Sequence, residues 1–125
     1  MKVLFASPDR DLLSGYRAVL EVMGHTVATA FDGAQIPDLI ASDAPDVAVM
    51  DETLPRFAAD GILCALRERH IPSILLSARE PAAVCGSGTS RPDAYLFFPF
   101  APSELIATIG QAAENAGGER RTGDG

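Results

Sequence analysis

Five short apolar runs recur at fairly even intervals, and they constrain the fold of this chain more than any other feature. Most are continuous rather than alternating, which is typical of strands covered on both faces by helices. Patterns with helical spacing fill most of the gaps between the runs. This alternation predicts one α/β domain built on a right-handed, doubly wound parallel sheet of five strands. The runs are Val3–Ala6, Thr26–Ala30, Val47–Met50, Ser73–Ser77 and Ala94–Phe98.

The helical patterns carry recognisable start and stop signals. We expect the first helix to begin at Ser7-Pro8-Asp9, which offers a capping hydroxyl, a proline at the first helical position and an acid in the first turn. It should end at Gly24, because glycine often terminates helices. The other expected helices cover Ile36–Ser42, Ala59–Arg69 and Pro102–Asn115.

Two segments lack a strong pattern. Residues 80–92 contain two prolines and two glycines with few apolar anchors, so we expect an irregular segment with at most a short helix at 82–85. The polar, glycine-rich residues 117–125 are expected to form a flexible tail. The domain itself should then occupy residues 1–116.

Charge and reactive side chains exclude several classes of function. The net charge of −7, without a basic stripe, argues against binding to nucleic acid or to an anionic membrane. Cys64 and Cys85 form no CxxC pair, and His25 and His70 complete no metal-binding spacing. The first apolar run is too short for a signal peptide or a membrane span, so we expect a cytoplasmic protein.

The carboxyl ends of the predicted strands should hold the functional site, because ligands bind there in open α/β sheets. Asp51 directly follows a buried central strand, and Ser77 ends the next one. The remaining strand ends are Ser7, Phe31 and Phe98.

These strand ends resemble those of response-regulator receiver domains, and the resemblance covers nearly all of the ordered chain. It implies a flavodoxin-like sheet with the strand order 2-1-3-4-5. It also implies that Asp51 occupies the position that accepts a phosphoryl group from a histidine kinase. Further matches are Pro55 and Asp60-Gly61 in the following loop, Ser77-Ala78 and Tyr95 at the switch positions, and Phe98-Pro99-Phe100 for the family's lysine-proline-phenylalanine.

The sequence departs from the receiver pattern at three pocket positions. Ser7 and Pro8 stand where receivers carry the acid pair that holds Mg²⁺, and Phe98 replaces the lysine that pairs with the phosphoryl group. Phosphoryl transfer depends on positive charge placed around the oxygens, and Mg²⁺ needs oxygen ligands that Asp51 alone supplies poorly. We therefore expect no metal cofactor, with Asp9 and Asp51 as weak metal candidates and Glu52 or Asp60 as the other acids that could restore a site.

Each pocket residue also has a purely structural interpretation. Asp51 could bond the backbone amides of the following loop, and Ser77 could do no more than satisfy nearby backbone. Ser7 is interpreted as a helix cap rather than a ligand. Phe98 could fill the space left by the lysine, and the bond before Pro99 is a candidate cis peptide, because receivers often have one there.

An aromatic cluster follows the fourth gap, and in receivers this region contacts partners. Its residues offer an interaction face for a protein such as a histidine kinase or another signalling protein, or for a homodimer. In the alternative, strand alternation buries Leu96 and Phe98 on one side and Tyr95 and Phe97 on the other. The candidate face comprises Tyr95, Phe97, Phe100 and Leu105.

Three functional hypotheses follow. The leading one is a stand-alone pseudo-receiver in two-component signalling, which binds a protein partner without Mg²⁺-dependent phosphorylation and is not an enzyme beyond weak self-phosphorylation or autophosphatase activity. The second is a working receiver that is phosphorylated on Asp51 and uses Mg²⁺. The third, a small-ligand binder of the flavodoxin type, is disfavoured because the loop after Ala6 offers acids where a phosphate would bind.

Overall fold

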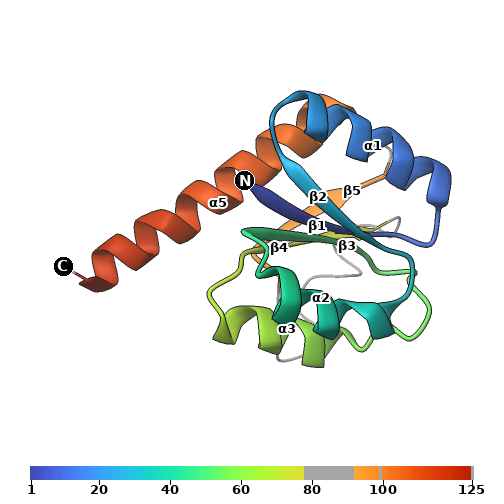
Figure 1. Cartoon of the computed structure of the whole chain (residues 1–125). Coiled ribbons are helices and arrows are strands. Elements are labelled where there is room, and N and C mark those ends of the chain that lie inside the picture. Colours follow the sequence, from blue (N-terminus) through green and yellow to red (C-terminus); the bar gives the residue numbers. More distant parts are fainter. Residues whose placement is uncertain (78–91, 99, 125) are drawn as a thin grey trace.

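The computed structural model describes residues 1–77, 92–98 and 100–124. A parallel five-stranded sheet in the order β2-β1-β3-β4-β5 forms its centre (Figure 1). The fold class and strand order expected from the sequence are therefore confirmed. The elements are β1 Lys2–Ala6, α1 Arg10–Val22, β2 Thr26–Ala30, a 3₁₀ turn at Gly33–Gln35, α2 Ile36–Asp43, β3 Val47–Asp51, α3 Ala59–Glu68, β4 Ser73–Ser77, β5 Ala94–Phe97 and α5 Pro102–Asp124.

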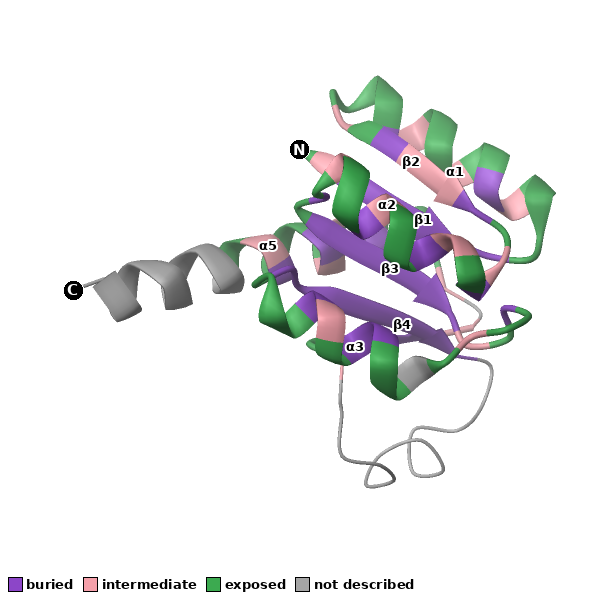
Figure 2. Ribbon diagram, turned by 60° about the horizontal axis from the view of Figure 1, so that its bottom comes forward, coloured by how far each residue is buried: buried purple, intermediate pink, exposed green. Residues whose placement is uncertain are grey.

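Helices cover both faces of the sheet, α1 and α5 on one side and α2 and α3 on the other (Figure 1). Successive strand side chains point to opposite faces, so Val3 and Phe5 join the first layer while Leu4 and Ala6 join the second. Every residue of β3 and β4 is buried, as the purple strands of Figure 2 show. This double coverage explains why the apolar runs are continuous rather than alternating.

The first helix begins later than the sequence suggests. Asp9, not Ser7, is the N-cap of α1, and its carboxylate accepts hydrogen bonds from the amides of Asp11 (3.0 Å) and Leu12 (3.1 Å). Ser7, directly after β1, is instead bonded to the neighbouring strand, because its amide donates to the carbonyl of Ala30 at 2.9 Å. The prediction of a helix start at Ser7-Pro8 is wrong because sheet pairing holds Ser7.

The last helix is longer than expected, since α5 continues to Asp124 instead of ending near Asn115. Figure 1 shows its C-terminal part extending away from the sheet. Each glycine in a helix costs about 1 kcal/mol relative to alanine but, unlike proline, leaves the hydrogen-bond ladder intact. The glycine pair therefore does not end the helix, while the flexibility of residues 117–125 stays a prediction.

Two expectations fall on parts of the chain outside the described residues. They are the irregular segment at 80–92, of which only residue 92 is described, and the cis peptide bond at Pro99. Within the part of the chain that the structure describes, none of the helices has the length and apolar character needed to cross a bilayer.

Helix α2 ends on a residue with unfavourable backbone geometry. Ala44 adopts the left-handed conformation (φ 47°) while its amide donates to the carbonyl of Ile40. We expect Ala44→Gly to stabilise the domain by about 0.5–1 kcal/mol, because glycine removes the left-handed penalty at a helix end. Urea denaturation measures this free energy of unfolding. The exposed control Ala41→Gly lies within α2 and should destabilise by about 1 kcal/mol; equal effects would contradict the prediction.

Candidate functional site

The parallel register brings three buried polar side chains to the carboxyl edge of the sheet. Ala6 pairs with Met50, so Ser7, which follows β1, lies beside Asp51, which ends β3. Asp51 in turn pairs with Leu76, next to Ser77. The exposed fractions of Ser7, Asp51 and Ser77 are 0%, 6% and 0%. The sequence correctly predicted that these residues share one edge.

Asp51 is the last residue of β3, and the loop that follows it holds its carboxylate. One carboxylate oxygen accepts hydrogen bonds from both the amide (2.8 Å) and the hydroxyl (2.7 Å) of Thr53. The amide of Leu54 donates to the carbonyl of Asp51 at 3.2 Å. The structural interpretation of Asp51, as an acceptor for the following loop, therefore describes what its carboxylate does here.

The end of β1 adds no carboxylate to this edge. The hydroxyl of Ser7 accepts a hydrogen bond from the amide of Asp9 at 3.2 Å, whereas the Asp9 carboxylate is engaged with the first turn of α1.

Asp60 is exposed in the first turn of α3. Among the described residues, no group of three or more histidine, cysteine, aspartate or glutamate side chains could hold a metal ion. Asp51 is thus the one buried carboxylate that the described residues place at this edge, whereas Mg²⁺ takes an octahedral set of oxygen ligands, part of them water or phosphate.

Aromatic packing replaces charge at the end of β5. The amide of Phe98 donates to the carbonyl of Ser77 at 2.9 Å, and its ring packs on the layer of α1 and α5. Ring centroids lie 4.9 Å apart for Phe98 and Phe100, 5.7 Å for Phe100 and Tyr16, and 5.7 Å for Tyr16 and Phe5. Partial burial raises the pKa of Tyr16. Phe98 is therefore part of an apolar chain of rings that reaches the core.

The interaction face expected from the sequence is divided by the sheet. Leu105 is fully buried between α5 and the strands, so its assignment to an exposed face is wrong; as an apolar residue of the first turns of α5 it faces the core. Phe100 is half-buried on the same side. Tyr95 packs on the opposite layer, where its ring stacks on Phe97 at 5.7 Å. The alternation of strand side chains places Phe98 and Tyr95 on different faces, as the alternative interpretation held.

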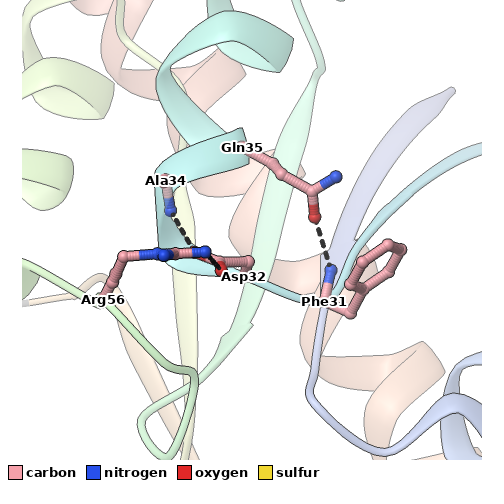
Figure 3. Close-up of polar contacts among 5 residues, drawn as sticks. All are labelled: Phe31, Asp32, Ala34, Gln35 and Arg56. Atoms are coloured by element: carbon pink, nitrogen blue, oxygen red, sulfur yellow. Dashed lines mark hydrogen bonds and ion pairs between the residues drawn. The ribbon is translucent and has the colours of Figure 1, made fainter.

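A polar contact that the sequence pattern did not predict joins two loops at this edge (Figure 3). Arg56, in the loop after β3, binds the carboxylate of Asp32, in the turn after β2, through two guanidinium nitrogens. The amide of Ala34 donates to the same carboxylate at 2.8 Å, and the amide of Phe31 donates to Gln35 at 2.9 Å. The Asp32-Gly33 pair directly after a predicted strand end was the available signal.

The guanidinium of Arg56 also favours the charged form of Asp32. Its hydrogen bond, with the Ala34 amide, lowers the pKa of the Asp32 carboxyl below its ordinary value, and the same pair raises the pKa of Arg56. Because the folded pKa of Asp32 is depressed, the pair stabilises the fold above the ordinary pKa of aspartate, and this contribution is lost as pH falls through the folded pKa.

We therefore expect Arg56→Gln to raise the pKa of Asp32 toward the ordinary value. The carboxyl ¹³C shift of Asp32, followed by NMR from neutral to acid pH, measures this midpoint. The Ala34 amide should keep the variant slightly below the ordinary value. An identical midpoint in both proteins would mean that Arg56 does not set the titration.

A comparison with known proteins identifies the family. No protein-family model matches the chain. The response regulator MprA of Mycobacterium avium is 34% identical over 112 residues, which cover 87% of this chain and 49% of that protein. MprA of Mycobacterium bovis gives the same figures. The chain therefore spans about half the length of the curated relatives it matches.

Solved structures agree over almost the whole chain. The receiver domain of the Francisella response regulator 1452 superposes with a TM-score of 0.80 at 30% identity, covering 91% of this chain and 97% of that one. A CheY-like receiver domain protein from Methanospirillum hungatei gives a TM-score of 0.83 at 21% identity, with 94% and 97% covered, and supports the fold alone. The sheet order, the aspartate that ends β3 and these likenesses together show that the chain belongs to the receiver domain family of two-component response regulators.

Proposed function

We propose that this receiver domain signals by binding a protein partner and does not depend on Mg²⁺-assisted phosphorylation of Asp51. The observation that carries the proposal is the make-up of the carboxyl edge. Asp51 is the one charged side chain among the buried residues that the structure describes, and Thr53 engages it. The matching positions for the acid pair and the lysine hold Ser7, Pro8 and Phe98.

Electrostatics explains why this composition disfavours phosphorylation. A phosphoryl group on Asp51 would bring about two negative charges to a buried edge. Receivers offset such charge with a metal ion and a lysine, whereas Ser7 and Phe98 here contribute none. An anion taken out of water without a cation is costly. The proposal accordingly includes no cofactor and no enzymatic role beyond weak self-phosphorylation or autophosphatase activity.

Amide NMR of the whole chain tests the proposal. The protein is titrated with Mg²⁺ and then with beryllofluoride, which mimics a phosphoryl group. We expect the resonances of Asp51, Thr53 and Ser77 to stay in place at millimolar Mg²⁺. Shifts centred on these residues, absent from an Asp51→Asn control, would overturn the proposal.

A working receiver is the second candidate. It is supported by Asp51, which ends the central strand of the sheet, and by the fully buried Ser77, which ends the strand beside it; these are the residue types that a receiver needs at its acceptor and switch positions. Under this candidate Mg²⁺ would be required, and the shifts just described would appear.

The surface that we propose for binding the protein partner lies on β5. The stacked rings of Tyr95 and Phe97 are only partly buried among the described residues, and aromatic side chains are enriched in protein interfaces. We propose a signalling protein such as a histidine kinase as the partner, with a homodimer through this face as the other option and no role for nucleic acid or membrane. A cytoplasmic location is part of this proposal.

A further inference from the structure

Two loops at the carboxyl edge are joined by backbone as well as by charge. The amide of Gly33 donates to the carbonyl of Pro55 at 2.8 Å. A side chain at Gly33 would lie 2.3 Å from the carbonyl oxygen of Arg56, so only glycine lets the two backbones approach this closely. The ion pair between Asp32 and Arg56 is a second link between the same two loops (Figure 3).

Arg56 reaches this pair from a backbone conformation that arginine rarely adopts. Its φ is 54°, in the left-handed region. Such a conformation persists where the surrounding structure enforces it. Two guanidinium nitrogens of Arg56 bind the Asp32 carboxylate, and the hydrogen bond from Gly33 to Pro55 holds the backbone directly before Arg56. The Arg56 side chain remains 75% exposed.

The same loop holds Asp51 at its other end. Thr53 donates two hydrogen bonds to the Asp51 carboxylate, and only Leu54 and Pro55 separate Thr53 from Arg56. Because the proline ring fixes the φ angle of Pro55, this short connection has little conformational freedom. Leu54 is buried in the core and offers a second way to anchor the loop.

We propose that the Asp32–Arg56 pair is a latch that positions the loop after β3, so that Thr53 stays on the carboxylate of Asp51. Opening the latch would release Thr53 and expose Asp51. The latch does not require phosphorylation of Asp51, so its test is independent of the test of the proposed function.

Amide exchange with water, measured by NMR on the whole chain, tests the latch. The variants are Asp32→Asn and Arg56→Gln. The matched control is Arg17→Gln, which breaks an exposed pair between Arg17 and Glu21 on α1 (3.4 Å) and touches neither loop. We expect the Thr53 and Gly33 amides to exchange faster by roughly two- to fivefold in both latch variants and unchanged in the control, a range set by the strength of exposed ion pairs.

Two outcomes would overturn the latch. If Gly33 exchanges faster while Thr53 does not, buried Leu54 holds the loop by itself. If neither amide responds in a folded variant, the ion pair positions nothing. The Arg56 side chain is 75% exposed, and asparagine at position 32 can still accept the hydrogen bond from the Ala34 amide. The amides of β3 and β4 should therefore keep their exchange rates and report an intact fold. If one variant fails this check, the other variant is used to test the latch.

Discussion

Gly33→Ala is expected to destabilise the domain by about 2 kcal/mol, the typical cost of forcing extra atoms into a packed site. The added methyl would lie 2.3 Å from the carbonyl oxygen of Arg56 and 2.7 Å from the α-carbon of Phe57. Both are backbone atoms, so the two loops must separate, and the bond from Gly33 to Pro55 is lost with them. Urea denaturation followed by circular dichroism measures the change.

Gly15→Ala is the matched control for this prediction. Gly15 lies inside α1, and apart from its chain neighbours and the helix's own nearby backbone, no described heavy atom lies within 4 Å of the added methyl. Alanine should therefore stabilise the helix by about 0.5–1 kcal/mol. Opposite signs for the two substitutions would confirm that the close approach at Gly33, rather than glycine itself, is needed. A neutral Gly33→Ala would mean that the loops are not packed against each other.

The triple variant Ser7→Asp, Pro8→Asp, Phe98→Lys is expected to bind Mg²⁺ and beryllofluoride at millimolar Mg²⁺, where the unmodified chain should bind neither. Ser7 follows the residue paired with Met50, so an aspartate there would lie beside Asp51. Two or three carboxylates at one edge can hold Mg²⁺, and a lysine offsets the phosphoryl charge. The cap of α1 should survive, because Asp9 provides it. The same amide NMR titration measures both ligands.

Partial variants separate the two contributions. Ser7→Asp, Pro8→Asp alone should bind Mg²⁺ with weaker beryllofluoride binding, and Phe98→Lys alone should bind neither. Phe98→Lys also removes the ring contact with Phe100 and should cost about 1 kcal/mol in unfolding free energy. If the folded triple variant fails to bind, the side chains at positions 7, 8 and 98 do not decide whether this edge binds Mg²⁺ and a phosphoryl group.

Much of the fold could be predicted because it depends on local patterns. The continuous apolar runs indicated a doubly covered sheet, and the position of Asp51 after one of them put it at the carboxyl edge. Element ends were less predictable, since they depend on competing bonds. Ser7 has a good capping side chain, but the carbonyl of Ala30 in a neighbouring strand holds its amide, and the cap passes to Asp9.

The candidate site divides in the same way. The sequence alone states which residues occupy the pocket positions. It shows, for example, that positions 7 and 8 carry serine and proline rather than two acids. What Asp51 does depends on Thr53, whose two hydrogen bonds arise from the path of the loop after β3. The burial of Leu105 likewise follows from the packing of α5 on the sheet rather than from its apolar character, which Phe97 shares.

The sequence by itself therefore determined the kind of sheet, the edge that carries Asp51 and the departures from the receiver pattern, because periodicity and residue type act over a few neighbouring positions. Only the tertiary structure decided the contact between the turn after β2 and the loop after β3. Asp32 and Arg56 lie 24 residues apart, and they meet because parallel strands end at one edge and Gly33 lets the backbones touch. The Asp32-Gly33 pair indicates a turn after β2, but which loop packs against that turn depends on how distant segments are brought together in space.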